Sequence, residues 1–293
     1  MIVRPEELSR FKNLHLLARW VVEGFVTGLH RSPYHGASAE FLDYREYTPG
    51  DDLRRLDWKV YGRTDRTYIR RYQSETNARA FVLLDASASM AYKAEGRDKA
   101  AYAAGLAACL LYLFQRQGDA AGLVVFSDMI RNFFEARTSA RHRRDLIAYL
   151  EKLSFSGRTA AKTVLDETAE RLGRRSICVL ISDFYDDPEA VAAGLRHLRF
   201  KHHEVIAFHL VDPTEESFQF DGLRSVIDLE SGERLLVDAA VIRSEYQARF
   251  KAHCDQIHRL AGDCMVDHVL MRTDTPFAEA LALYLHHRAR RRR

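Results

Sequence analysis

Short apolar runs alternate with amphipathic stretches along the chain from about residue 79 onward. The runs are roughly four to eight residues long and rich in β-branched and aromatic side chains, which is typical of strands buried in a parallel sheet. The expected strands cover residues 80–85, 121–128, 176–183, 204–212 and 264–271, and residues 130–136 are expected to form a hairpin with the second of them. The stretches between them predict helices at about 98–117, 140–153, 161–172, 188–200, 239–261 and from 275 onward. This alternation predicts an α/β fold with a doubly wound, mostly parallel sheet and helices on both faces.

Two segments depart from this alternation. Residues 5–27 carry apolar side chains at three- and four-residue spacing, which predicts an amphipathic helix that begins near Pro5 and ends before Gly28. Residues 28–78 are aromatic, charged and rich in turn residues. We therefore expect two regions: 1–78, with the helix and a small β- and turn-rich part, and 79–293, the α/β domain. Within that domain, residues 217–238 predict an inserted β-hairpin that turns at Ser231–Gly232.

Composition excludes several classes of protein. A net charge of +3 over 293 residues is too small to indicate nucleic-acid binding, and the basic tail at 286–293 is expected to be solvated. No apolar run approaches the length of about eighteen residues that a membrane span needs, and the first residues do not resemble a signal peptide. The cysteines lack a CxxC pair and are expected to stay reduced; they are Cys109, Cys178, Cys254 and Cys264. We therefore expect a cytoplasmic protein.

Side chains that carry oxygen atoms occur in three loops expected at the ends of strands. Asp85, Ser87 and Ser89 come at the end of the first strand, Thr159 lies in the strand-end loop Gly157-Arg158-Thr159, and Asp183 ends a later strand. The carboxyl ends of parallel strands share one edge of a sheet, so these oxygens are expected to meet there. Any one of them alone is more often a helix cap or an ordinary strand-end acid. Together they suit a hard cation such as Mg²⁺, and neutral hydroxyl ligands would leave it charge enough to bind a further carboxylate.

The segment Asp85-Ala-Ser87-Ala-Ser89 resembles the DxSxS motif of the metal-ion-dependent adhesion site in von Willebrand factor A domains. Thr159 and Asp183 stand where that family has its later threonine and aspartate. The resemblance implies a von Willebrand factor A-like fold over residues 79–293. It also implies that Ser87, Ser89 and Thr159 bind Mg²⁺ directly, that Asp85 and Asp183 act through water, and that Mn²⁺ or Ca²⁺ is an alternative. Arg158 is a departure, because the family often has glycine there.

The upstream segment resembles the hallmark region of a bacterial family of unknown function, DUF58. The resemblance lies in Pro49-Gly50-Asp51-Asp52, then Arg54, then Asp57-Trp58. Members are often encoded beside MoxR-type AAA+ ATPases, which implies such an ATPase, its client, or both as protein partners. The same residues also suit a turn and helix cap with internal Arg–Asp pairs. The alternative is a partner-binding surface formed by Asp51, Asp52, Arg54, Asp57 and Arg158.

A catalytic interpretation is weaker. An aspartate at a strand end can accept a phosphoryl group, as in haloacid-dehalogenase-like phosphatases, but that chemistry needs a second acid two residues later, where Ser87 stands. There is no GxSxG elbow and no GxxxxGK(S/T) loop. We therefore predict no catalytic residue and a non-enzymatic, Mg²⁺-dependent protein-binding module. The alternative is a phosphatase-like or other metal-dependent hydrolytic α/β domain. The sequence leaves the oligomeric state and the identity of the client open.

Overall fold

The structure is a computed structural model that describes residues 13–31, 41–46, 62, 67–72 and 78–290. The chain divides into two compact units, one of Met1–Phe25 together with Ala78–Arg293 and the other of Val26–Asn77. Of the described residues, 13–25 group with the larger unit, and the expected boundary between residues 78 and 79 stays a prediction. Each unit is therefore treated by itself.

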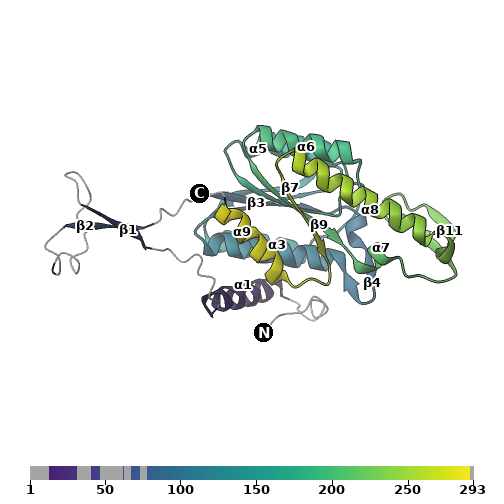
Figure 1. Ribbon diagram of the computed structural model, residues 1–293, viewed down its shortest axis with the longest axis horizontal. Coiled ribbons are helices and arrows are strands. Elements are labelled where there is room, and N and C mark those ends of the chain that lie inside the picture. The colour runs from purple at the N-terminus through teal and green to yellow at the C-terminus, as the bar shows by residue number, and fades with distance from the viewer. Residues whose placement is uncertain (1–12, 32–40, 47–61, 63–66, 73–77, 291–293) are drawn as a thin grey trace. The chain divides into compact units, whose positions relative to one another are not determined.

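The larger unit is built on one six-stranded sheet (Figure 1). Its strands, in order across the sheet, are β12 (Asp267–Arg272), β9 (Glu204–Val211), β8 (Ile177–Ser182), β3 (Arg79–Asp85), β6 (Ala120–Phe126) and β7 (Ile130–Arg137). All neighbours are parallel except β7, which runs antiparallel to β6. Counted along the chain the order is 6-5-4-1-2-3, which is that of a doubly wound sheet. The predicted α/β fold with a doubly wound, mostly parallel sheet and the predicted hairpin of β6 and β7 are confirmed.

Helices cover both faces of this sheet (Figure 1). One face carries α3 (Lys99–Arg116), α4 (Ala140–Glu151), α9 (Phe277–Arg290) and the first part of α1 (Leu14–Arg31). The other face carries α5 (Ala161–Leu172), α6 (Pro188–Phe200) and α8 (Ala239–Asp263), and the short α7 (Pro213–Ser217) follows β9. Because both faces are covered, β8 is buried along its whole length and β3 along all but its first residue. This is why these strands read as continuous apolar runs rather than alternating ones.

Helix α1 begins at Leu14, where the side chain of Asn13 accepts a hydrogen bond of 2.9 Å from the backbone of Leu16. Its buried residues, Leu17 and Val22 among them, pack within the larger unit. The expected start near Pro5 lies outside the described residues. The expected end before Gly28 is wrong, because the helix continues to Arg31. A single glycine inside a helix costs only about 1 kcal/mol, so it does not by itself end one.

Small antiparallel pairs complete the described structure. In the smaller unit, β1 (Phe41–Glu46) pairs with β2 (Tyr68–Tyr72). In the larger unit, β10 (Leu223–Ile227) pairs with β11 (Arg234–Asp238), which confirms the inserted hairpin. The strands β4 (Lys93–Ala94) and β5 (Arg97–Asp98) lie between a 3-10 turn at Ser89–Ala91 and α3. None of the helices in the described part of the chain combines the length and the apolar character of a membrane span.

Candidate functional site

The predicted site lies at the centre of the sheet, at the carboxyl ends of β3 and β8. Strands β3 and β8 are neighbours, but the chain leaves them toward opposite edges of the sheet, to β6 and to β9. Ligands of doubly wound proteins bind outside the carboxyl ends of the strands at such a switch point. Asp85 ends β3, and Asp183 directly follows β8. Both side chains are buried, and the charge of Asp183 acts on Asp85, so carboxylates from the ends of the two central strands lie near each other at the switch point.

Asp85 organises the loop after β3. One of its carboxylate oxygens accepts a hydrogen bond of 2.9 Å from the backbone N–H of Ser87, and the other accepts one of 2.6 Å from the hydroxyl of Ser182. Burial, and then the nearby charge of Asp183, raise the pKa of Asp85 to about 7. A cation beside this pair of carboxylates would relieve the repulsion. Asp85 therefore shapes the loop and supplies negative potential, and both of its oxygens are engaged within the protein.

The two serines and Asp183 form a connected set of oxygens. The hydroxyls of Ser87 and Ser89 lie 3.0 Å apart, and the hydroxyl of Ser89 donates to Asp183 Oδ1 at 3.2 Å. Adjacent ligands of an octahedral Mg²⁺ ion, at metal–oxygen distances of about 2.1 Å, are about 3.0 Å apart. The spacing of these oxygens therefore fits a magnesium ion. In the part of the chain that the structure describes, no three His, Cys, Asp or Glu side chains form a metal-binding group, so any metal here needs the hydroxyls.

Lys99 is a member of the site that sequence analysis missed. It is fully buried at the start of α3, and its ammonium group lies 3.1 Å from Asp183 Oδ2 and 2.7 Å from Glu215 Oε1. Burial alone would lower the pKa of Lys99, but the charges of Asp183 and Glu215 outweigh it and raise that pKa. The aromatic rings of Tyr92 and Tyr185 also lie within cation–π distance of the ammonium, at 5.6 and 5.3 Å. Lys99 thus neutralises part of the negative charge at the switch point.

Thr159 lies in a loop tied to the serine loop by two backbone hydrogen bonds, one between Ala88 N and Gly157 O at 2.9 Å and one between Ser156 N and Ala86 O at 2.8 Å. Gly157 has φ +79°, a conformation that favours glycine. The hydroxyl of Thr159 donates to Glu230 Oε1 at 2.9 Å. The structure therefore joins Asp85, Ser87, Ser89 and Asp183 directly or through one neighbour, and it places Thr159 on the adjoining loop, bound to a glutamate that the sequence did not suggest.

The remaining predicted site residues belong to the proposed partner-binding surface. Arg158 is exposed beside Thr159. Its charge also acts on Asp228 of the hairpin, whose pKa is lowered mainly by the Ser231 hydroxyl and by the Glu230 backbone, with a smaller contribution from Arg158. The other members, Asp51, Asp52, Arg54 and Asp57, lie outside the described residues, and their role stays a prediction.

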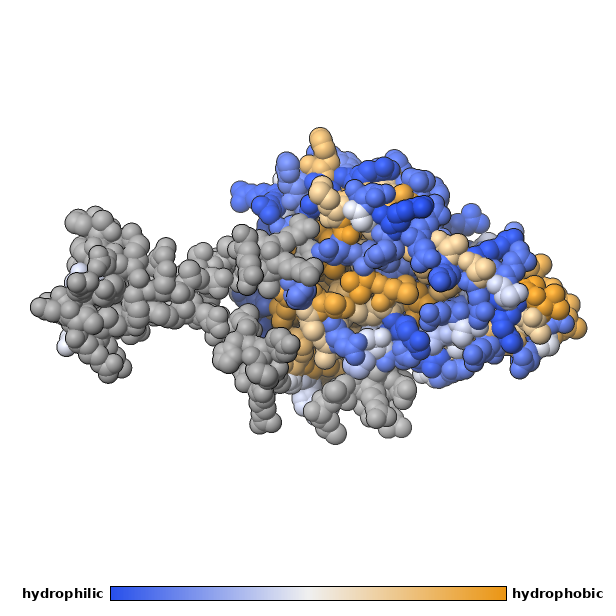
Figure 2. Space-filling view, in the orientation of Figure 1, coloured by the Kyte–Doolittle hydropathy of each residue, from blue (hydrophilic) through white to orange (hydrophobic). Residues whose placement is uncertain are grey.

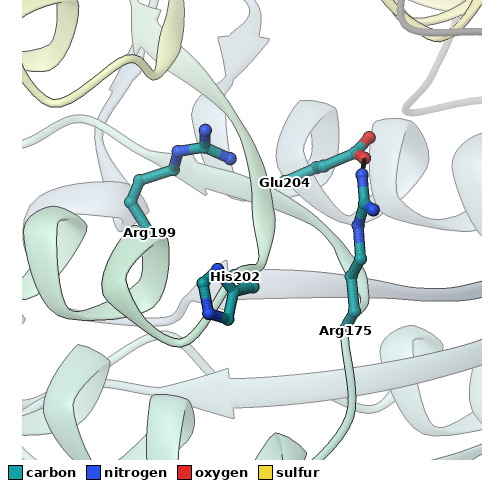
Figure 3. Close-up of a pocket in the computed structure, with 4 residues that line it drawn as sticks. All are labelled: Arg175, Arg199, His202 and Glu204. Atoms are coloured by element: carbon teal, nitrogen blue, oxygen red, sulfur yellow. Dashed lines mark hydrogen bonds and ion pairs between the residues drawn. The ribbon is translucent and has the colours of Figure 1, made fainter.

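A separate pocket lies at the opposite edge of the sheet, beside the amino ends of β8 and β9 (Figure 3). Arg175, Arg199, His202 and Glu204 line it. Arg175 donates to Glu204 at 2.5 Å, and Arg199 donates to the backbone oxygen of His203 at 2.6 Å. Both arginines thus already have partners within the chain. The pocket shares no residue with the site at the carboxyl ends of the strands.

Comparisons with known proteins place the chain among uncharacterized relatives. Proteins of Mycobacterium bovis and Mycobacterium tuberculosis, each described only as uncharacterized, are 25% identical over 291 residues, which cover 98% of this chain and 91% of theirs. Among solved structures, a conserved hypothetical protein, BatB of Bacteroides thetaiotaomicron, has 14% identity and a TM-score of 0.49 over 73% of this chain and 99% of its own. The pilus adhesin SpaC of Lactobacillus rhamnosus GG has 14% identity and a TM-score of 0.44 over 74% and 30%.

A family match covers most of the chain. Residues 43–256 match the family described as "Protein of unknown function DUF58". The match includes the predicted hallmark segment from Asp51 to Asp57, the strand-end site and the β10–β11 hairpin. The chain therefore belongs to the DUF58 family.

Proposed function

We propose that this protein is a non-enzymatic, Mg²⁺-dependent protein-binding module that holds a carboxylate of its partner through the site at the ends of β3 and β8. The observation that carries the proposal is the connected oxygen set of Ser87, Ser89 and Asp183, with separations of 3.0 and 3.2 Å that fit neighbouring ligands of Mg²⁺. The hydroxyls of Ser87, Ser89 and Thr159 would bind the ion directly. Asp85 and Asp183 would act through water.

The charges around the site favour recruitment of an outside carboxylate. A bound magnesium ion would supply a concentrated positive charge with neutral hydroxyl ligands. Lys99 already offsets Asp183 and Glu215 from within the fold, so less of the protein's own negative charge would face the ion. Exposed Arg158 adds positive charge at the rim beside Thr159. An acidic side chain of a partner therefore meets a favourable potential here.

The surroundings of Asp85 weigh against the alternative, a phosphatase-like or other hydrolytic domain. A phosphoryl acceptor needs a free carboxylate oxygen that faces the substrate. Asp85 is fully buried, and its two oxygens accept from Ser87 N and the Ser182 hydroxyl. No hydrogen bond links a histidine to Ser87 or Ser89 among the described residues, so a serine nucleophile lacks a base there. Turnover of a generic phosphoester that is lost in Asp85→Ala would support the alternative.

For the partner we propose a MoxR-type AAA+ ATPase, its client, or both. This rests on the DUF58 membership and on what the resemblance of the PGDD segment implies about neighbouring genes. The candidate residues for that partner are Arg158 at the rim of the site and, on the other unit of the chain, Asp51, Asp52, Arg54 and Asp57.

Thermal unfolding in EDTA and across a Mg²⁺ series tests the metal site. At one hundred times its dissociation constant, a bound ion adds about 2.7 kcal/mol to the free energy of unfolding. In a domain of this size the melting temperature should rise by roughly 5 °C or more. The double variant Ser87→Ala/Ser89→Ala should lose this rise, while Ser225→Ala, an exposed serine of β10, should keep it. An equal rise in the double variant, or none in the wild type at millimolar Mg²⁺, would contradict the proposal.

A further inference from the structure

The β10–β11 hairpin is an exposed element whose turn carries one half-buried side chain. Every residue of β10 is exposed, and so are residues 221–229 and 231–236 as a whole. Glu230, at the turn, is the exception and is half-buried. Figure 2 shows apolar side chains gathered at this end of the larger unit, where Leu223, Leu235 and Leu236 are exposed. The hairpin therefore gains little from burial of its own side chains.

Glu230 is held by the candidate site. Its carboxylate accepts 2.9 Å and 3.4 Å hydrogen bonds from the hydroxyl and the backbone N–H of Thr159. Among the described residues, these are the hydrogen bonds that join the side chains of residues 226–234 to the rest of the chain. A carboxylate of the chain itself is thus hydrogen-bonded to Thr159, one of the three hydroxyl side chains expected to bind the metal ion.

The turn presents Glu230 in a defined conformation. Asp228 accepts hydrogen bonds from Glu230 N at 2.8 Å and from the Ser231 hydroxyl at 2.7 Å. The backbone oxygen of Asp228 accepts a hydrogen bond from Gly232 N at 2.8 Å, and Asp228 N donates one to Glu233 O at 2.9 Å. Gly232 has φ +75°, which suits glycine. The turn is therefore ordered by its own bonds, and Glu230 does not depend on Thr159 for its shape.

We propose that Glu230 is an internal stand-in for the partner's carboxylate, and that an acidic segment with the chemistry of the hairpin turn binds this site by displacing it. The proposal rests on the proposed function, because it assigns the same position to the partner's acidic side chain. It adds the class of ligand, a turn-forming acidic segment that resembles Asp228–Leu229–Glu230, and it adds a competitor within the chain. Displacement breaks the contacts with Thr159 and leaves the turn's own hydrogen bonds intact.

Internal occupancy lowers the apparent affinity for a partner. The measured dissociation constant equals the intrinsic one divided by the fraction of molecules with an open site. If the hairpin holds the site about nine-tenths of the time, its removal tightens binding about tenfold. Because the strands of the hairpin are exposed, the loss of one side chain at its tip leaves the folded core unchanged.

The test measures binding of a fluorescein-labelled peptide of residues 223–238 to the full chain in millimolar Mg²⁺. Glu230→Ala should bind the peptide about tenfold more tightly than the wild type. The matched control is Glu233→Ala, an exposed glutamate of the same turn, which should bind as the wild type does. A peptide with glutamine in place of its glutamate at position 230 should not bind. Unchanged melting temperatures of both variants would show that the fold is intact.

Equal affinity of the wild type and Glu230→Ala, or no binding to Glu230→Ala, would overturn the internal stand-in. Binding of Mn²⁺ alone to the wild type, measured by water-proton relaxation, tests the proposed function separately. No Mn²⁺ binding together with a tenfold difference for the peptide would overturn the metal-dependent function and support the internal contact. Mn²⁺ binding without a difference in peptide affinity would support the metal-dependent function and overturn the internal stand-in.

Discussion

The strand-end site and the β10–β11 hairpin meet through Thr159 and Glu230, but they are stabilised in different ways. At the site, Lys99 and Asp183 are 0% and 1% exposed and belong to the buried interior. In the hairpin, Leu223 and Leu236 are 71% and 70% exposed. Polar groups inside the core are fixed by their partners, because an unpaired buried charge is costly. The turn of the hairpin is held by its own hydrogen bonds and by the Glu230 anchor, while Asp238 at the end of β11 caps α8.

Loss of the buried cation should give the largest effect. Lys99→Met leaves Asp183 and Glu215 without their shared partner, and breaking a buried ion pair in this way costs about 3–5 kcal/mol. Urea unfolding of the variant measures the loss. The control is Lys162→Met, whose ion pair with Asp166 is exposed and should contribute less than about 1 kcal/mol. Equal stabilities of the two variants would mean that Lys99 does not neutralise the site.

A matched pair of leucines sharpens the comparison of core and hairpin. Leu83 of β3 is fully buried, whereas Leu236 of β11 is 70% exposed. Leu83→Ala should lower the free energy of unfolding by about 2–5 kcal/mol, because it leaves a cavity in the core. Leu236→Ala should change it by less than about 0.5 kcal/mol. Denaturant unfolding compares the two. A cost above 1 kcal/mol for Leu236→Ala would show that the hairpin contributes to the stability of the domain.

A row of three histidines beside the site predicts a loss of stability in acid. His268 Nε2 lies 3.1 Å from His209 Nδ1, and His268 Nδ1 lies 3.2 Å from His258 Nδ1. Burial, and then the charge of His258, lower the pKa of His268 to about 4. The ordinary pKa is 6.5, so the unfolded chain takes up the proton first. The stabilisation is complete above about pH 6.5 and falls as the pH drops toward 4, by about 3 kcal/mol at most.

His268→Gln should flatten this dependence. The measurement is the free energy of unfolding between pH 7 and pH 4, from urea titrations of the wild type and the variant. His286→Gln, an exposed histidine of α9, is the control and should follow the wild-type curve. Parallel curves for wild type and His268→Gln would show that other groups account for the acid sensitivity.

The elements of the sheet were predictable because their signals are local. The strands around Asp85 and Asp183 are continuous apolar runs, and the turn at Ser231–Gly232 carries its own residue preferences. The order of Asp85, Ser87 and Ser89 along one loop was also readable, since the backbone places them together wherever that loop lies. The end of α1 was not predictable from Gly28, because one glycine does not by itself end a helix and α1 continues to Arg31.

The sequence by itself determined the fold class and the oxygen-bearing loops, since hydrophobic period and short motifs are set by neighbouring residues. The tertiary structure alone decided which charges face those loops. Lys99 meets Asp183 across 84 positions and Glu215 across 116, and Thr159 meets Glu230 across 71. Such pairs depend on how α3, α7 and the hairpin pack around the switch point. No periodicity along the chain records that packing, because an isolated lysine or glutamate looks the same in a solvated face as in a buried site.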